Sequence, residues 1–307
     1  MSIYDIIPPL NATSVLKRYG LRADKSLGQN FLQDPFALEK IADAAGIEPG
    51  DSVLEIGPGL GSLTRYLALS ARQVIAVELD AELLPPLRSI LKPHANVRLV
   101  HGDILKLSPS ELINQPNYIV AANIPYYLTS AIIRHLLEHE PRPRRMVLTM
   151  QKEVAERICA APGDLSLLAL SVQVYGNPAI TGRIPAGAFY PAPKVDSAIL
   201  RLDIYESPLI PHEQLGTFFK LIKAGFSQKR KTLRNSLSGG LHIPTTETES
   251  MLKQSGIDPQ RRAETLSIPE WRALCDIHPK NNVTARNEAV SCCEGIASPK
   301  ARNDMAE

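Results

Sequence analysis

A glycine-rich loop between an apolar strand and a helix constrains the fold of this chain most. Residues 52–56 (Ser-Val-Leu-Glu-Ile) predict a buried strand, and Gly57-Pro58-Gly59-Leu60-Gly61 follows before a helical stretch at 62–70. Glycines allow a sharp turn and a close approach of the backbone to a ligand. A second strand at 73–77 ends at Glu78, whose carboxylate can accept hydrogen bonds from ribose hydroxyls. The pattern predicts an α/β sheet with a nucleotide-type site.

The spacing of the glycines bears on the ligand. The loop is Gly-x-Gly-x-Gly with Pro58 in the middle, whereas the dinucleotide fingerprint is Gly-x-Gly-x-x-Gly. A dinucleotide fold remains an alternative at this point. The departure favours S-adenosylmethionine, which carries no phosphate, over a ligand with a pyrophosphate.

Two further strands end in polar residues. A strand at 97–101 is closed by Gly102-Asp103, and an apolar run at 118–122 precedes Asn123-Ile124-Pro125-Tyr126. Asp103 either accepts the adenine amino hydrogen of a cofactor or caps a turn. The Asn123 side-chain oxygen and the Ile124 carbonyl can accept both hydrogens of an exocyclic amine and free its lone pair. Ligands of open α/β sheets bind at the carboxyl ends of the strands, so these residues are expected to meet.

From about residue 14 to about residue 276 the sequence resembles the 16S ribosomal RNA adenine N6,N6-dimethyltransferases. The matching segments follow the order and spacing of that family. They are 26–32 (SLGQNFL), 54–59 (LEIGPG), 77–80 (VELD), 102–103 (GD), 123–127 (NIPYY), 150–157 (MQKEVAER), 189–197 (FYPAPKVDS) and 226–235 (FSQKRKTLRN). One departure is the stretch after Pro162-Gly163, which lacks the Lys and Tyr that family members often carry.

The resemblance implies a Rossmann-like, class I S-adenosylmethionine-dependent methyltransferase sheet of about seven strands, followed by a small helical domain. It implies methyl transfer to N6 of two adjacent adenosines in a hairpin loop near the 3′ end of 16S rRNA, within the small ribosomal subunit. Tyr126 is expected to stack on the flipped adenine with Phe189 on its other face, although Phe189 taken alone fits a core aromatic. The implied cofactor-binding residues are Asn30, Leu32, Gly57, Glu78, Asp103 and Asn123, the last also catalytic.

The residues give no sign of a general base or a metal. The histidines lack ligand spacing with the four cysteines, so no metal site is predicted. Catalysis is expected to rest on alignment and on dipoles. Three alternatives to a small-subunit methylase remain: a resistance-type methylase of large-subunit RNA, an assembly factor that binds immature subunits, and, more distantly, a nicotinamide dehydrogenase. The segment at 228–235 and the helical region that follows favour the small subunit over the large one.

The net charge is only +2, but the cations are clustered. From Gln214 to Thr246 there is no acid. Such clusters suit phosphate contacts, although a charge run is often only a solvated face. The residues predicted to bind RNA are Lys223, Lys229, Arg230, Lys231 and Arg234. Two further clusters are Arg142, Arg144 and Arg145, and Lys17, Arg18, Arg22 and Lys25.

The remaining elements complete two predicted domains. Asp34 and Pro35 begin a helix that Gly46 ends, and Ser267-Ile268-Pro269-Glu270 is a capping box. Further strands are expected at 145–149, 168–175 and 197–202, the last two as an antiparallel pair, and helices at 212–225, 229–237 and 247–255. We predict an N-terminal arm at 1–25, a methyltransferase domain at 26–206, a helical RNA-binding domain at 207–278 and a disordered tail at 279–307. Because the sequence shows no apolar span and no signal sequence, we expect a cytoplasmic protein. We also expect it to be a monomer.

Overall fold

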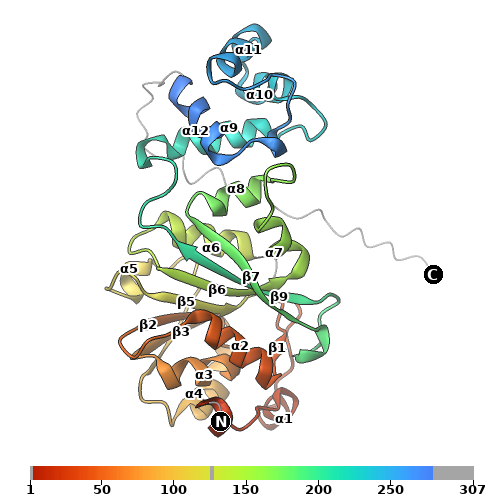
Figure 1. The fold of residues 1–307 in the computed structure, drawn as a ribbon. Coiled ribbons are helices and arrows are strands. Elements are labelled where there is room, and N and C mark those ends of the chain that lie inside the picture. Colours follow the sequence, from red (N-terminus) through yellow and green to blue (C-terminus); the bar gives the residue numbers. More distant parts are fainter. Residues whose placement is uncertain (1–2, 125–127, 279–307) are drawn as a thin grey trace, which may run out of the picture.

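The fold is built on a seven-stranded sheet with helices on both faces (Figure 1). The computed structural model describes residues 3–124 and 128–278. The strands are β1 (Phe31–Leu32), β2 (Ser52–Ile56), β3 (Gln73–Glu78), β4 (Val97–His101), β5 (Ile119–Asn123), β6 (Arg145–Gln151), β7 (Gly176–Ile184), β8 (Phe189–Tyr190) and β9 (Ser197–Ile204). The helices are α1 (Ala12–Arg18), α2 (Pro35–Ala45), α3 (Ser62–Ser70), α4 (Leu84–Leu91), α5 (Pro109–Leu112), α6 (Thr129–Glu138), α7 (Lys152–Ile158), α8 (Leu167–Gln173), α9 (Leu215–Gly225), α10 (Leu233–Leu241), α11 (Thr245–Gln254) and α12 (Ile268–Ile277).

The strand order is β4-β3-β2-β5-β6-β9-β7, which confirms the predicted sheet of about seven strands. The first five strands of this order run parallel to one another, and β9 runs antiparallel to both β6 and β7. The chain order reverses between β2 and β5, which are neighbours in register Ile56↔Ala122. In an open α/β sheet this reversal leaves a crevice at the carboxyl ends of the strands, where ligands bind.

Both faces of the sheet are covered, because its central strands are apolar on both sides. On one face, Val53, Val74 and Ile119 form a buried cluster with residues of α2 and α3. On the other face, Leu54 and Val120 belong to a cluster that includes residues of α6, α7 and α8. Such fully buried parallel strands read as continuous hydrophobic runs, which is why the sequence identified them.

The capping signals in the sequence are confirmed. The side chain of Asp34 accepts a hydrogen bond from the Phe36 N–H at the start of α2, and Gly46 ends that helix with a left-handed φ of 57°. At α12, Ser267 and Glu270 form the predicted capping box. Such caps satisfy backbone groups that the helix itself leaves unpaired.

The strand predicted at 168–175 is wrong. These residues lie in α8 and its C-terminal end, and the strand that pairs with β9 is β7, which begins at Gly176. Ser166 caps α8 by accepting a hydrogen bond from the Ala169 N–H, and Ala169 and Val172 are buried on one face. Periodicity cannot separate a short buried helix from a buried strand of this length. The predicted antiparallel pair of last strands is nevertheless present.

The helices α9 to α12 gather at one end of the molecule (Figure 1). Residues 229–232 precede α10 rather than belong to it, so the helix predicted at 229–237 begins too early. One hydrophobic cluster extends from the sheet into these helices, with the Tyr175 ring stacked near that of Phe219 at 6.4 Å between centroids. The short stretch after Pro162 also reaches this region, because the Gly163 N–H donates to the Glu264 carbonyl at 2.9 Å. The domain boundary at 206/207 therefore stays a prediction, and the tail at 279–307 lies outside the described residues.

The start of the chain is folded against the sheet domain. In α1, Leu16 packs with Phe31 and with Leu60 of the glycine loop. The two-residue strands β1 and β8 pair antiparallel, so Leu32 lies opposite Phe189. Residues 3–32 thus belong to the same packed body as the glycine loop.

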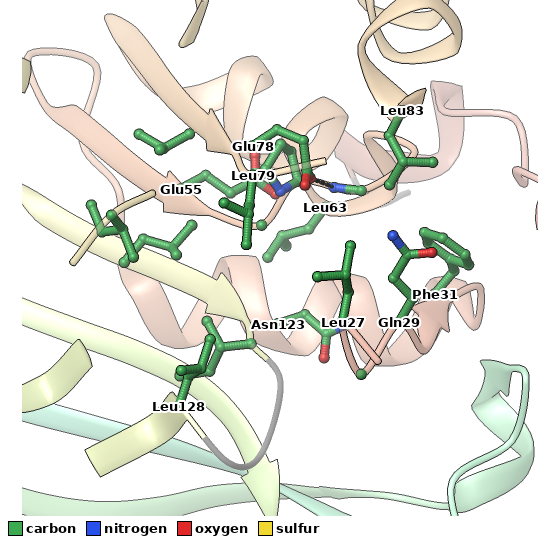
Figure 2. Close-up of a pocket in the computed structure, with 18 of the residues that line it drawn as sticks. Leu27, Gln29, Phe31, Glu55, Leu63, Glu78, Leu79, Leu83, Asn123 and Leu128 are labelled. Atoms are coloured by element: carbon green, nitrogen blue, oxygen red, sulfur yellow. Dashed lines mark hydrogen bonds between the residues drawn. The ribbon is translucent and has the colours of Figure 1, made fainter. Parts of the chain in front are cut away.

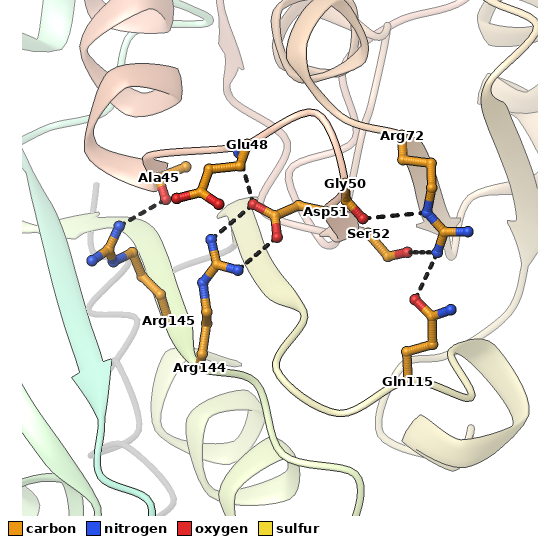
Figure 3. A network of polar contacts seen from close by, with 9 residues as sticks. All are labelled: Ala45, Glu48, Gly50, Asp51, Ser52, Arg72, Gln115, Arg144 and Arg145. Carbon is orange, nitrogen blue, oxygen red and sulfur yellow. Dashed lines mark hydrogen bonds and ion pairs between the residues drawn. The ribbon is translucent and has the colours of Figure 1, made fainter.

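At the amino ends of the strands, arginines are paired with carboxylates, as Figure 3 shows for Arg144 and Asp51. Arg144 makes a two-pronged contact with Asp51 at 2.6 and 2.8 Å, and Arg145 pairs with Asp203 at 2.5 Å. Arg142 pairs with Glu140 at 3.2 Å. Binding of phosphate by these three arginines is thus not favoured, because each one already pairs with a carboxylate of the protein. Within residues 3–124 and 128–278, no helix is long and apolar enough to cross a bilayer.

Candidate active site

A pocket opens at the carboxyl ends of β2, β3, β4 and β5, beside the strand-order reversal (Figure 2). It is lined by the glycine loop, by residues 27–32 of the segment before α2, and by the residues that end the four strands. All six residues predicted to bind the cofactor line this one pocket. They are Asn30, Leu32, Gly57, Glu78, Asp103 and Asn123.

The glycine loop leaves space at the floor of the pocket. Gly57 has a φ of 68°, and a Cβ placed there would find its nearest neighbour, the Asn123 carbonyl oxygen, only at 4.0 Å. Gly59 has a φ of 58°, and a Cβ placed on it would lie only 3.1 Å from the Phe31 ring. Gly57 therefore provides an open approach to backbone, and Gly59 provides a turn that only glycine adopts readily.

Glu78 ties the end of β3 to the glycine loop. One carboxylate oxygen accepts a hydrogen bond from the Gly59 N–H at 2.9 Å, and the other accepts from the Asp80 N–H at 2.9 Å. The side chain is 6% exposed, and burial raises the pKa of Glu78 despite these two donors. Each carboxylate oxygen has a second lone pair, so Glu78 can still accept from a ligand hydroxyl.

Glu55 is a pocket residue that sequence reasoning missed. It is 1% exposed within β2, and one of its carboxyl oxygens finds no hydrogen-bond partner among the described residues. Burial raises the pKa of Glu55 to about 8, and the neighbouring Glu78 carboxylate raises it too. A carboxyl in the middle of an otherwise apolar strand was the available signal, since buried acids are rare without a partner.

Asp103 caps a turn, as one of the two interpretations of the sequence expected, and its role toward a cofactor stays a prediction. Its Oδ1 accepts from the Leu105 N–H at 3.0 Å, which caps the turn after β4, and the Lys106 ammonium lies 3.8 Å from Oδ2. The half-buried side chain also lines the pocket. A turn-capping aspartate can therefore present its remaining lone pairs to a ligand.

Asn123 ends β5 and contacts the segment that crosses the pocket. Its side-chain nitrogen donates to the backbone carbonyl of Asn30 at 3.1 Å. This acceptor fixes which end of the amide carries nitrogen, so the oxygen Oδ1 is directed elsewhere. Within residues 3–124 and 128–278 no donor reaches Oδ1. Tyr126, predicted to stack on the target base, lies outside the described residues.

Gln29 is a second residue that the sequence did not single out for a role. Its side-chain oxygen accepts from the Asp24 N–H at 2.8 Å, and its nitrogen donates to the Asp80 carboxylate at 2.6 Å. The backbone N–H of Asp80 in turn donates to the Glu78 carboxylate. Asp80 therefore connects the segment before β1 to Glu78 at the end of β3. The motif that contains Gln29 and Asn30 thus anchors one wall of the pocket.

Phe189 lies opposite Leu32 in the β1–β8 pair, beside the wall of the pocket. Its ring is 3% exposed and packs with Leu32, Ile184 and Ala188 in a hydrophobic cluster. This burial matches the core-aromatic interpretation of the residue. Its role in stacking on a base stays a prediction.

The residues predicted to bind RNA differ in their surroundings. Lys229, Arg230 and Lys231 are exposed between α9 and α10 and form no ion pair within the described part of the chain. Arg234 lies on α10 and pairs with Glu249 at 3.4 Å. Lys223 is exposed on α9. Of this set, the three residues of the turn are the most available to phosphate.

The sheet order and the pocket at its carboxyl edge define a Rossmann-like methyltransferase of class I. The family model described as ribosomal RNA adenine dimethylase matches residues 20–279. This chain belongs to that family.

Known relatives agree with this assignment. A Dehalococcoides mccartyi protein named Ribosomal RNA small subunit methyltransferase A is 47% identical over 271 residues, covering 88% of this chain and 93% of that protein. A Geobacillus kaustophilus protein of the same name is 42% identical over 280 residues, covering 88% and 96%. Among solved structures, a dimethyladenosine transferase from Plasmodium falciparum matches with a TM-score of 0.70, 28% identity and coverage of 80% and 95%. The 23S rRNA methyltransferase ErmE matches with a TM-score of 0.65, 31% identity and coverage of 81% and 99%.

Proposed function

We propose that this protein transfers methyl groups from S-adenosylmethionine to N6 of two adjacent adenosines in the hairpin loop near the 3′ end of 16S rRNA. The observation that carries the proposal is the position of Asn123. Its amide is oriented by Asn30 in the same pocket that holds Glu78 and the glycine loop. The residues that we propose as amine acceptor and as cofactor ligands therefore line one cavity, which supports the proposal.

The residues of the pocket fit the cofactor. Glu78 retains acceptor capacity for the ribose hydroxyls, and Asp103 for the adenine amine. Gly57 leaves open space for the methionine portion, and Asn30 and Leu32 are placed to cover it. The Glu55 carboxyl, with its unpaired oxygen, adds a further acceptor to a pocket that receives a cationic ligand. S-adenosylmethionine supplies a methyl group activated by a sulfonium sulfur.

The chain has to activate and align the attacking amine. The adenine amine is a weak nucleophile because its lone pair is conjugated with the ring. Oδ1 of Asn123, together with the Ile124 carbonyl, accepts the amine hydrogens and draws the nitrogen toward tetrahedral geometry. Fixed dipoles and alignment of the reacting atoms supply the rate enhancement, without a strong base.

The target adenine has to leave its stack to reach the pocket. Extruding a base costs a few kcal/mol, which an aromatic stack inside the pocket partly offsets. Tyr126 and Phe189 are the aromatics we assign to this role from the family resemblance. A second transfer requires space for the first methyl group beside the amine.

The small subunit is favoured as substrate over the large one. The relatives named for the small subunit reach 49% identity, whereas the 23S rRNA methyltransferase ErmE shares 31%. The exposed turn at 229–231 and the helices around it extend the substrate surface beyond the sheet domain. We infer a cytoplasmic enzyme that acts on the small subunit during its biogenesis.

The proposal is tested with unmethylated small subunits, unmethylated large subunits and S-adenosylmethionine. Mass spectrometry of digested RNA is expected to show N6,N6-dimethyladenosine only in 16S rRNA, at two adjacent positions. Dimethyladenosine in 23S rRNA would instead support the resistance-type alternative. Tight binding of small subunits without any methyl transfer would support the assembly-factor alternative.

A further inference from the structure

The segment before the pocket carries four exposed cations, Lys17, Arg18, Arg22 and Lys25, which we call the arm patch. Lys17 and Arg18 lie in the last turn of α1, and the other two follow it. None of the four forms an ion pair within residues 3–124 and 128–278. The single acid between residues 6 and 33 is Asp24, and its Oδ1 accepts from the Ser26 N–H and hydroxyl at 2.7 Å each.

Other clustered cations of the chain do form ion pairs. The arginines at the amino ends of the strands are each engaged by a carboxylate, as at Arg144 and Asp51 (Figure 3). That edge lies away from the pocket, which is at the carboxyl ends. The arm patch has a similar density of charge but lacks the neutralising partners. Uncompensated cations therefore remain in the segment that leads into the pocket lining at Leu27.

The arm patch is held in a fixed position beside the pocket. On its inner side, Leu16 and Leu21 pack with Phe31. Hydrogen bonds fasten both ends of the segment, from the Ala12 N–H to Gln33 at 3.0 Å and from the Asp24 N–H to Gln29 at 2.8 Å. Two residues after Lys25 the chain begins to line the pocket at Leu27. Because the backbone that carries these cations is already ordered, binding does not have to order it, which favours a specific contact.

We propose that the arm patch binds the phosphates of the RNA strand that flanks the target adenosine. An adenine that enters the pocket brings the phosphates on its two sides to the pocket mouth, where the arm patch lies. Each lysine or arginine that neutralises a phosphate releases a bound counterion and makes affinity dependent on salt. This inference rests on the proposed function, because it takes RNA as the substrate.

The arm patch and the turn at 229–231 form two separate electrostatic contacts. In Figure 1, α1 and the pair α10–α11 lie at opposite ends of the molecule. The turn would bind the body of the substrate, and the arm patch would bind the strand next to the reacting base. Loss of the arm patch should therefore impair delivery of the base without affecting the cofactor.

The test uses two double variants of the arm patch. One combines Lys17→Gln and Arg18→Gln, and the other combines Arg22→Gln and Lys25→Gln. A control double variant combines Lys40→Gln and Arg157→Gln. The control residues are exposed on α2 and α7, form no ion pair within the described ranges and do not line the pocket. All three variants change the net charge by the same amount. Affinity for unmethylated small subunits is measured at several salt concentrations, and cofactor affinity is measured by calorimetry.

Each phosphate contact contributes about 0.7–0.9 to the slope of the logarithm of the binding constant against the logarithm of the salt concentration. Loss of two contacts in each arm variant is therefore expected to make this slope shallower by about 1.5. KM for the subunit should rise while kcat and cofactor affinity stay near the wild-type values. Unchanged slopes in both arm variants, or an equal change in the control, would overturn the inference. The binding slopes do not depend on catalysis, so a failure of the proposed function, seen as absence of methyl transfer by the wild-type protein, is a separate result.

Discussion

The side-chain nitrogen of Asn123 donates a hydrogen bond to the backbone carbonyl of Asn30, 93 residues earlier in the chain, at 3.1 Å. This bond joins the end of β5 to the segment that crosses the pocket. It also orients the amide, since only the nitrogen end can face a carbonyl. The Asn123 oxygen that we propose to polarise the amine is therefore positioned by the same segment that is expected to cover the cofactor.

Replacement of Asn123 tests this arrangement. Asn123→Ala should lower kcat by at least about 100-fold, the loss typical when one preorganised dipole is removed. Asn123→Asp should be similarly impaired, because its carboxylate cannot donate to the Asn30 carbonyl. Cofactor affinity, measured by calorimetry, should change much less than kcat. Full activity in Asn123→Ala would refute the assigned role.

Replacement of Glu78 should affect both the ligand and the fold. Glu78→Ala leaves the N–H groups of Gly59 and Asp80 without their acceptor, and each such loss costs about 1–3 kcal/mol. We expect lower thermal stability without ligand and a raised cofactor dissociation constant. Glu78→Gln retains one oxygen acceptor and should fall between Ala and wild type on both scales. A cofactor dissociation constant in Glu78→Ala equal to that of the wild type would contradict this role.

Burial of Glu55 predicts a pH dependence of stability. The pKa rises from 4.5 to about 8 on folding, so between these values the folded protein holds a proton that the unfolded chain has lost. Raising the pH in this window therefore favours unfolding, by up to about 1.4 kcal/mol per pH unit. Glu55→Gln does not titrate, so its advantage over the wild type should grow from pH 5 to pH 8 in thermal unfolding. A difference that is independent of pH would show that Glu55 is not buried in its neutral form.

The turn between α9 and α10 should contribute to subunit binding. Arg230→Glu with Lys231→Glu should weaken binding to small subunits and reduce its salt slope. Arg234→Gln should have a smaller effect on that slope, because Arg234 is already paired with Glu249 at 3.4 Å. The effect of Arg234→Gln on stability should be small, as for other exposed ion pairs. Equal effects of the two changes on the slope would contradict the distinction.

Much of the sheet and pocket could be predicted because the signals were local. Largely apolar strands are followed by a polar residue or a glycine, and parallel order brings those ends to one edge. The meeting of Gly57, Glu78, Asp103 and Asn123 follows from that rule. Cap residues such as Asp34 and Gly46 likewise act within a few positions of themselves.

Sequence reasoning was least informative where distant partners decide the outcome. Arg144 is engaged by Asp51, 93 residues away, and Arg145 by Asp203, 58 residues away, so a cluster of arginines in the sequence was a poor guide to free charge. The 168–175 segment forms a helix because the sheet and α9 bury its apolar face, which its short pattern could not specify. Gln29 likewise gained its role from Asp80, 51 residues later.

The central claim is that one pocket brings the cofactor's methyl group to an adenine amine held by Asn123. A crystal structure of the protein with S-adenosylmethionine bound tests it most directly. The account predicts the ribose hydroxyls on Glu78, the adenine beside Asp103 and the methyl group facing Oδ1 of Asn123. A cofactor bound outside this pocket, or bound there with Asn123 turned away from the methyl group, would contradict it.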